Sequence, residues 1–134
     1  NAQNVAAYLH SRPEVSWIRF PGLKEDKDYA LAQKYMPKGT CGVIAFGLKG
    51  GRNTCIKFMD SLKFISIVTH VADARSCVLH PASHTHRQLS DEQLAEAGIP
   101  IDLIRMSVGI EALEDIIADI EQAMAEAYKQ CVQN

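Results

Sequence analysis

The chain has 134 residues, a formal net charge of −2, and 47% hydrophobic and 22% charged residues. These values are ordinary for one soluble globular domain, which buries roughly two thirds of its unfolded surface on folding. The charge balance, with no basic stripe, argues against nucleic acid as a partner. Every apolar run is far shorter than the ~20 residues of a membrane span, so we expect no membrane segment.

Short helical and strand-like patterns alternate along the chain. Residues 4–10 have helical spacing and stop before Pro13, and residues 15–20 resemble a strand that is buried on both faces for part of its length. Further helices are predicted at residues 28–36, 53–62 and 90–97, the last of which opens with a capping box at Ser90 and Gln93. Further strands are predicted at residues 42–48, 64–68, 75–80 and 103–108.

The last helix is the clearest predicted element. Apolar residues recur at i, i+3 and i+4 along one face, which is typical of core packing. This stripe consists of Leu113, Ile116, Ile117, Ile120, Met124 and Ala127. Strands interleaved with helices and joined by short turns predict an α/β (α+β-like) sandwich, with helices covering one side of a small sheet.

The cysteines are widely spaced and form no C-x-x-C pair. They are Cys41, Cys55, Cys77 and Cys131. Cys41 and Cys77 lie in or beside apolar runs, where cysteine is usually a small buried hydrophobe. We therefore expect reduced thiols in a cytosolic protein, without a disulfide framework.

The N-terminus carries no signal-peptide pattern. The chain opens at Asn1, without an initiator Met, and enters a helical pattern at once. No charged region followed by an apolar region precedes that pattern. We expect this end to be a cut edge of a longer protein.

Two motifs suggest ligands on first reading. The run from Gly42 to Lys49 resembles a phosphate loop, but its lysine does not directly follow the second glycine, so a strand and a glycine turn are favoured. His80, His84 and His86 have an H-x3-H-x-H spacing that could bind zinc. A fourth ligand is not evident and His80 resembles the end of a strand, so we expect no metal site.

Arg105 is the most informative single residue. It lies in an otherwise apolar segment, residues 99–110, that reads as a buried strand. A guanidinium cannot lose its proton, so a half-buried Arg requires an anion. Residue chemistry alone favours a carboxylate of the protein and leaves a ligand as the alternative. Ser76, Thr85 and Arg105 together indicate a small, basic polar pocket.

Several motifs recur in a fixed order along the whole chain. They are Pro21-Gly22-Leu23, Lys34-Tyr35-Met36-Pro37-Lys38-Gly39, Asp60-Ser61-Leu62-Lys63, Asp73-Ala74-Arg75-Ser76, His80-Pro81-Ala82-Ser83 with Thr85-His86, and Arg105-Met106-Ser107-Val108-Gly109-Ile110-Glu111. Together they resemble the C-terminal domain of the pyridoxal-phosphate enzymes of cysteine and methionine metabolism. The O-acetylhomoserine sulfhydrylase branch is the most similar.

The resemblance implies a fold and a domain organisation. Residues 1–134 would form the C-terminal small domain of a fold-type I enzyme, with a small, mostly antiparallel sheet covered by helices on one side. The larger domain, which in this family carries the cofactor lysine, is absent from this chain. The full-length enzyme would bind pyridoxal 5'-phosphate, whereas this chain would bind none covalently and would be inactive alone.

The resemblance also implies a reaction, partners and site residues. A sulfide or thiol would replace acetate at the γ carbon of a small O-acetylhomoserine-like amino acid, in a cytoplasmic homo-oligomer, expected to be a tetramer. Arg105 would bind the substrate α-carboxylate, with Ser76 beside it. Thr85 would line the substrate side of the pocket, and Arg75 would tune which side chain is accepted.

Two departures from the family pattern border this site. His84 stands where the sulfhydrylases usually have a smaller hydroxyl residue, and His70-Val71-Ala72 replaces a segment that typically carries Asn and Gly. Both indicate altered substrate preference or relaxed selection for catalysis. The alternative function is an autonomous, non-catalytic α/β module that binds a small carboxylate.

Overall fold

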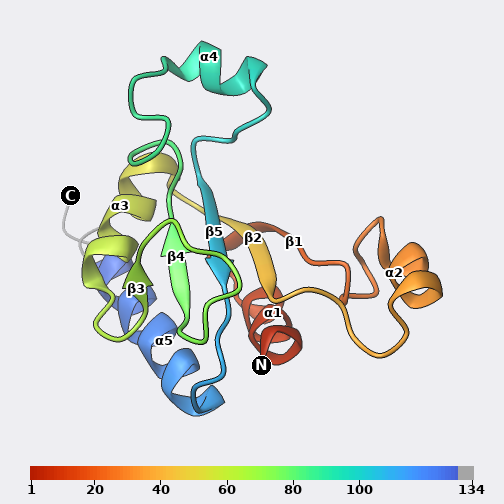
Figure 1. Cartoon of the computed structure of the whole chain (residues 1–134). Helices are drawn as coiled ribbons and strands as arrows, with labels where there is room; N and C mark the ends of the chain where they lie inside the picture. Colours follow the sequence, from red (N-terminus) through yellow and green to blue (C-terminus); the bar gives the residue numbers. More distant parts are fainter. Residues whose placement is uncertain (130–134) are drawn as a thin grey trace.

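A five-stranded sheet with helices on one face forms the body of the protein. The computed structural model describes residues 1–129. The strands are β1 (Val15–Arg19), β2 (Val43–Leu48), β3 (Ser66–Ile67), β4 (Cys77–Leu79) and β5 (Leu103–Ser107). The helices are α1 (Ala2–Ser11), α2 (Tyr29–Tyr35), α3 (Gly51–Ser61), α4 (Asp91–Glu96) and α5 (Leu113–Lys129). Figure 1 shows α1, α3 and α5 beside the sheet, with α2 and α4 projecting away from it.

The sheet is mostly antiparallel, as predicted. Its strand order is β1-β2-β5-β4-β3. The pairs β1–β2, β2–β5 and β4–β5 are antiparallel, and only the short β3–β4 pair is parallel. The α/β fold class and the interleaving of helices and strands are therefore confirmed.

The two faces of the sheet differ in their surroundings. Ile44 and Phe46 of β2 and Ile104 and Met106 of β5 are fully buried in the core against the helices. Each such side chain contributes about 1.5–3 kcal/mol through burial. Side chains alternate along a strand, so residues between these positions, such as Arg105, point to the opposite face. That second face, which we call the open face, has none of α1, α3 or α5 on it.

Helix α5 supplies the apolar stripe that the sequence predicts. Ile116, Ile120 and Met124 are buried in the core, and Leu113 packs against it at the edge. The helix also provides most of the contact with α3. None of the helices in residues 1–129 is long and apolar enough to cross a membrane.

Two predictions overestimated how much of a strand is buried. Residues 99–110 do not form one buried strand: β5 is Leu103–Ser107, and Ile101 and Ile110 are 38% and 83% exposed. Ile101 lies in the turn before β5 and Ile110 lies beyond the strand, so the sheet does not cover these two side chains. Trp17 and Ile18 of β1 are each only half-buried, because β1 is an edge strand.

The expectation for Cys41 was wrong. Its side chain is exposed, because β2 begins at Val43 and Cys41 remains in the preceding connection. Cys55 and Cys77 are buried free thiols, and burial raises the pKa of Cys55 to about 12. Cys131 lies outside the described residues.

A buried carboxylate on α5 fixes the connection from α3 to β3. Asp119 is 5% exposed and accepts hydrogen bonds from three consecutive backbone N–H groups, those of Lys63, Phe64 and Ile65, at 2.8–3.0 Å. Gln122 also donates to it, at 3.0 Å. Buried backbone donors must be paired, so this one side chain determines the path of the loop.

Replacing Asp119 with Ala should destabilise the protein by about 2–4 kcal/mol, because three backbone donors would lose a charged acceptor. Urea unfolding measures this change. Glu121→Ala removes an exposed carboxylate from the middle of the same helix and should change stability by less than about 0.5 kcal/mol. Equal effects of the two substitutions would contradict the account.

Candidate functional site

Arg105 lies half-buried in the middle of the open face. Its Nη2 donates a hydrogen bond to the Thr69 carbonyl at 2.8 Å. Within residues 1–129 no carboxylate lies within 4.0 Å of it, so the internal ion pair that residue chemistry favoured is not formed there. A guanidinium has five N–H donors in a planar fork. Most of this fork is therefore not used by the residues that the structure describes.

The segment from residue 68 to 75, which we call the β3–β4 loop, is attached to β5 by two side chains. Arg105 holds it at Thr69, and the Ser107 hydroxyl accepts a hydrogen bond from the Ala72 N–H at 3.0 Å. Arg105 and Ser107 are two residues apart on one strand, so both project from the open face. The loop therefore lies beside the guanidinium.

Ala72 holds a strained conformation in this loop. Its φ of +58° makes it the one non-glycine residue of the described chain with a positive φ. This left-handed region costs a residue with a Cβ about 1–3 kcal/mol, whereas glycine adopts it freely. Ala72 belongs to the segment His70-Val71-Ala72, which departs from the sequence pattern that the resemblance implies.

Ser76 is buried and fully hydrogen-bonded within the protein. Its hydroxyl donates to Glu111 Oε2 at 2.9 Å and accepts from the Gly109 N–H at 3.0 Å, and its own N–H donates to Glu111 Oε1 at 2.5 Å. Burial alone would raise the pKa of Glu111, but the hydrogen bonds from Ser76 and the backbone outweigh it and lower the pKa. The predicted contact between Ser76 and substrate stays a prediction.

Gly109 leaves no room for a side chain at this junction. A Cβ there would lie 2.4 Å from the Ala74 carbonyl oxygen and 2.4 Å from Glu111 Oε2. The sequence motif contained Gly109 and Glu111, but their role was not predicted, because Glu111 lies 35 positions from Ser76. A carboxylate shortly after a strand was the only available signal.

Arg75 and Thr85 lie in different surroundings. Arg75 is exposed and pairs with Asp73 at 3.3 Å. Hydrogen bonds from the Arg75 backbone and side chain, and from His70, lower the pKa of Asp73 to about 2. Thr85 is exposed, with its hydroxyl 2.9 Å from His86 Nδ1.

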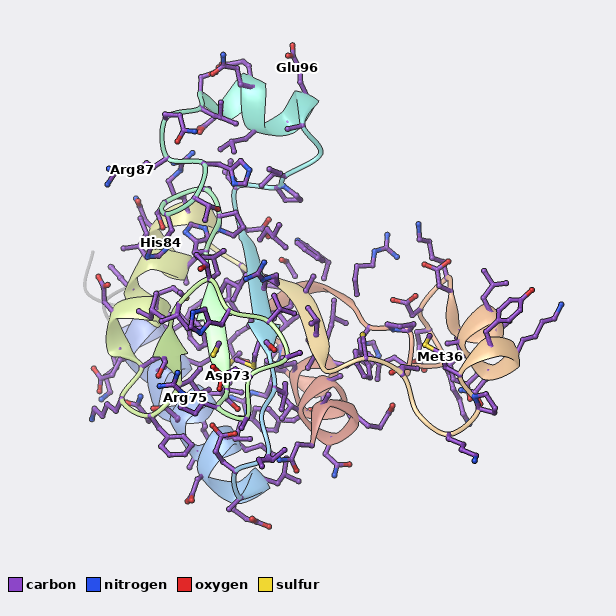
Figure 2. All side chains as sticks on the ribbon, viewed as in Figure 1. Met36, Asp73, Arg75, His84, Arg87 and Glu96 are labelled. Carbon is purple, nitrogen blue, oxygen red and sulfur yellow. The ribbon has the colours of Figure 1, made fainter. Side chains whose placement is uncertain are left out.

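The β3–β4 loop links three of the four predicted site residues: Arg75 and Ser76 lie at its end, whereas Arg105 bonds its beginning at Thr69 and pairs with Leu79 at the far end of β4. Arg75 and Ser76 directly precede β4 and adjoin the loop that Arg105 holds. Thr85 follows β4 beyond its other end. Figure 2 shows this separation, with Asp73 and Arg75 near one end of β4 and His84 near the other. Thr85 is therefore not beside Ser76 within the described chain.

His80 is a structural residue in this fold. It is fully buried, with Nδ1 2.7 Å from Ser83 Oγ and Nε2 2.9 Å from the Ile101 carbonyl. Nε2 must carry the proton to donate to a carbonyl, so Nδ1 accepts from the Ser83 hydroxyl. Burial lowers the pKa of His80 and favours this neutral form. The described residues contain no group of three side chains placed to hold a metal ion.

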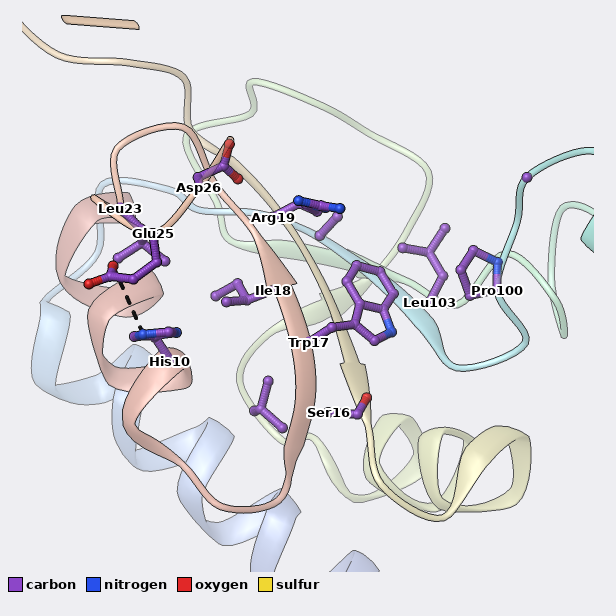
Figure 3. A pocket seen from close by; sticks show the side chains of 13 residues that line it. His10, Ser16, Trp17, Ile18, Arg19, Leu23, Glu25, Asp26, Pro100 and Leu103 are labelled. Carbon is purple, nitrogen blue, oxygen red and sulfur yellow. Dashed lines mark ion pairs between the residues drawn. The ribbon is translucent and has the colours of Figure 1, made fainter. Parts of the chain in front are cut away.

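A hollow of about 820 Å³ surrounds β1, at the edge of the sheet. Trp17, Arg19, Ala45 and Leu103 line its part on the open face, whereas His10 and Glu25 line its other side. Figure 3 shows Arg19 and Trp17 near Leu103, with the His10–Glu25 ion pair on the far side of the strand.

Sequence comparison decides the family. Residues 1–125 match the family of Cys/Met metabolism PLP-dependent enzymes. The chain belongs to this family. It is 41% identical over 125 residues to O-acetyl-L-homoserine sulfhydrylase of Leptospira meyeri, covering 92% of this chain and 28% of that protein. It is 44% identical over 127 residues to homocysteine synthase of Schizosaccharomyces pombe, covering 95% and 30%.

Structural comparison agrees with the sequence. A Campylobacter jejuni protein assigned as an O-acetylhomoserine (thiol)-lyase superposes with a TM-score of 0.83 at 34% identity, covering 92% of this chain and 30% of that one. That protein contains a pyridoxyl-lysine adduct. The present chain thus spans about 30% of the length of the relatives that it matches.

The family depends on pyridoxal phosphate, but the described residues do not fit a covalent site for it. A lysine that forms a Schiff base is usually desolvated or placed beside another cation. In residues 1–129 every lysine is exposed except Lys57, which is half-buried on α3. The exposed lysines of residues 1–129 therefore lack the surroundings of a Schiff-base lysine.

Replacing Ala72 with Gly should stabilise the protein by up to about 1 kcal/mol, because relief of the left-handed strain exceeds the added entropy of the unfolded chain. Denaturant unfolding tests this. Ala74→Gly, two residues along the same loop and without a positive φ, should instead be neutral or destabilising. Destabilisation by Ala72→Gly would refute the strain.

Stability should also depend on the protonation of His80. In the unfolded chain His has its ordinary pKa of 6.5, and in the folded protein the pKa is lower. Between these values the unfolded state binds more protons, so the contribution of His80 to the free energy of unfolding should be constant above pH 6.5 and fall as the pH decreases from 6.5 to the lowered pKa. An NMR titration of the His80 ring with a midpoint at or above 6.5 would contradict this.

Proposed function

We propose that this chain is the C-terminal, substrate-binding part of a pyridoxal-phosphate-dependent enzyme similar to O-acetylhomoserine sulfhydrylase. Membership of the family and the similarity to sulfhydrylases support this proposal. The remaining length of the relatives leaves room for a larger domain that holds the cofactor and its lysine. The chain alone would then be inactive, and its parent would be a cytoplasmic homo-oligomer, with a tetramer as the expected form.

The observation that carries the proposal is the guanidinium of Arg105. It is half-buried on the open face and, within residues 1–129, has only a backbone carbonyl as acceptor. A carboxylate accepts two parallel hydrogen bonds from such a fork, and this arrangement fixes its orientation as well as its position. We assign the substrate α-carboxylate to this place.

The neighbouring residues position the binding surface. Arg105 and Ser107 of β5 bond the β3–β4 loop at Thr69 and Ala72. Glu111 fixes the end of the loop next to β4, because it accepts the N–H of Ser76. Ser76 therefore acts on the carboxylate site chiefly through the backbone that it anchors. Arg75, exposed at the end of this loop, is placed to select among substrate side chains. Thr85 would line a more distant part of the pocket.

The reaction is a γ-replacement that needs no redox partner. A sulfide or thiol sulfur forms a bond to the γ carbon, the bond from that carbon to the ester oxygen breaks, and acetate leaves with the electron pair. Sulfide gives homocysteine, and methanethiol gives methionine. Pyridoxal phosphate, held by the rest of the parent, supplies the electron sink. Correct orientation by Arg105 determines which substrate bond is activated.

Replacing Arg105 with Lys in the full-length parent should lower kcat/KM for O-acetylhomoserine by about 100-fold. Lysine keeps the charge but loses the two-pronged contact, which is worth about 1.5–3 kcal/mol for charged hydrogen bonds. Steady-state kinetics measures this change. Arg87→Lys, an exposed Arg on another connection, serves as the matched control.

The control should retain kcat/KM within about twofold of the wild-type value. If Arg105→Lys lowers kcat/KM by less than threefold, the assignment of the α-carboxylate to Arg105 is wrong. If the wild-type parent has no sulfhydrylase activity, the proposed reaction is wrong.

A further inference from the structure

The connection between β1 and β2 is much longer than the sheet requires. The two strands are antiparallel neighbours, and their register pairs Arg19 with Ala45. A hairpin connection usually needs about two to five residues, whereas much longer connections in compact domains commonly carry a function. Here residues 20–42 link the two strands and include the helix α2. Figure 1 shows this segment extending away from the sheet, with α2 at its far end.

The base of this connection is attached to the body of the protein. Phe20 is buried in the core, and its N–H donates to Asp26 at 2.9 Å. Gln3 of α1 donates to the Gly22 carbonyl at 2.9 Å. Residues 24–42, which we call the arm, contribute no side chain to the core of the described chain. The body therefore sets where the arm begins, whereas the arm itself lies outside the core.

Helix α2 exposes large apolar side chains on the arm. Leu31, Tyr35 and Met36 are 56%, 69% and 42% exposed. Figure 2 shows Met36 on the projecting arm. Ala32 is the one buried residue of this helix, and the N-cap residue Asp28 makes no side-chain capping bond. A helix of fewer than about 12 residues is marginal in water without packing, so this one gains stability from a partner that covers its apolar residues.

A hollow of about 460 Å³ lies beside α2. Leu31, Tyr35 and Met36 line it on one side, and Pro21 and Arg19 line it where the chain leaves β1. Arg19 also lines the larger hollow at β1, so the two hollows adjoin at the edge of the open face. An apolar segment seated in the smaller hollow would cover the exposed side chains of α2.

The length of the relatives indicates what this segment belongs to. The residues that match the family, 1–125, include the arm. This chain spans about 30% of the length of the relatives that it matches. Under the proposed function, a larger part of the parent therefore folds against this chain. Interfaces between domains of one protein commonly use exposed apolar surfaces of this kind.

We propose that the arm is a docking element, and that Leu31, Tyr35 and Met36 pack against an apolar segment of the larger part of the parent. The proposal rests on the proposed function for the existence of that larger part. The hollow beside α2 receives the segment, and Arg19 places it at the edge of the open face. The arm then helps to align the larger part with the face that carries Arg105.

Hydrogen–deuterium exchange of the full-length parent tests whether the arm is covered. The backbone amides of residues 29–36 should exchange about 100-fold or more slowly than those of an unfolded peptide, because docking stabilises the helix. A two-turn helix that stays exposed should exchange only roughly two- to fivefold more slowly. Exchange at this faster rate would overturn the proposal.

A matched pair of substitutions in the parent tests the apolar contact. Leu31→Asp should raise the exchange rate of residues 29–36 by about tenfold or more, because it places a charge in the docked surface. Gln33→Asp adds the same residue to the same helix at an exposed position that does not line the hollow. It should change this rate by less than about threefold. Equal effects of the two substitutions would refute docking through the apolar side chains.

Photo-crosslinking identifies the occupant of the hollow. Benzoylphenylalanine in place of Tyr35 of the parent should form a covalent product with the larger part, which peptide mass spectrometry locates. The same photoreactive residue in place of Glu121, which is exposed on α5, serves as the control and should give no such product. A product with the arm of a second copy, or no product at all, would overturn the proposal.

These outcomes are separable from the fate of the proposed function. A parent without sulfhydrylase activity in which position 35 crosslinks to the larger part would refute the proposed reaction and keep the docking arm. An active parent without this product would keep the reaction and refute the arm.

Discussion

The alternation of side chains along β5 is the constraint on which the site depends. Ile104 and Met106 are fully buried in the core, which determines the register of β5 in the sheet. Arg105 lies between them, and the period of two residues turns it to the other face. A shift by one residue would bury the guanidinium in the core and expose two large apolar side chains. Core packing thus holds the guanidinium on the open face.

The loop beside Arg105 depends on the same strand and on the chain that follows it. Ser107 of β5 accepts the Ala72 N–H, and Glu111, just beyond the strand, accepts both the N–H and the hydroxyl of Ser76. Gly109 allows this close approach because a Cβ there would collide with the loop backbone. The strand, its continuation and the β3–β4 loop therefore form one hydrogen-bonded unit. The strain at Ala72 is retained because this unit fixes the loop on both sides.

Periodicity predicted the elements of the fold well, because their apolar faces are strongly patterned. The apolar stripe of α5 predicts both the helix and its buried face, and the apolar run of residues 42–48 predicts the strand β2. Strand ends were less predictable, since the apolar residues of 99–110 continue beyond the five that pair in the sheet. Cys41 shows the same limit, because an apolar neighbourhood in the sequence does not ensure burial.

Local sequence patterns could not predict which residues contact one another at the site. Chemistry indicated that Arg105 needs an anion, but which carboxylates approach it depends on the tertiary fold. Asp119 and Ser76 have partners more than 30 positions away, so no spacing rule could identify them. The left-handed conformation of Ala72 was likewise hidden, although the departure from glycine in that segment marked the place.

The most direct test of the account is a structure of the full-length parent with a bound amino-acid substrate analogue. The account predicts that the α-carboxylate lies about 2.7–2.9 Å from two nitrogens of the Arg105 guanidinium, on the open face of the sheet. A carboxylate bound elsewhere, with the Arg105 guanidinium still hydrogen-bonded to the Thr69 carbonyl and to no ligand, would contradict it.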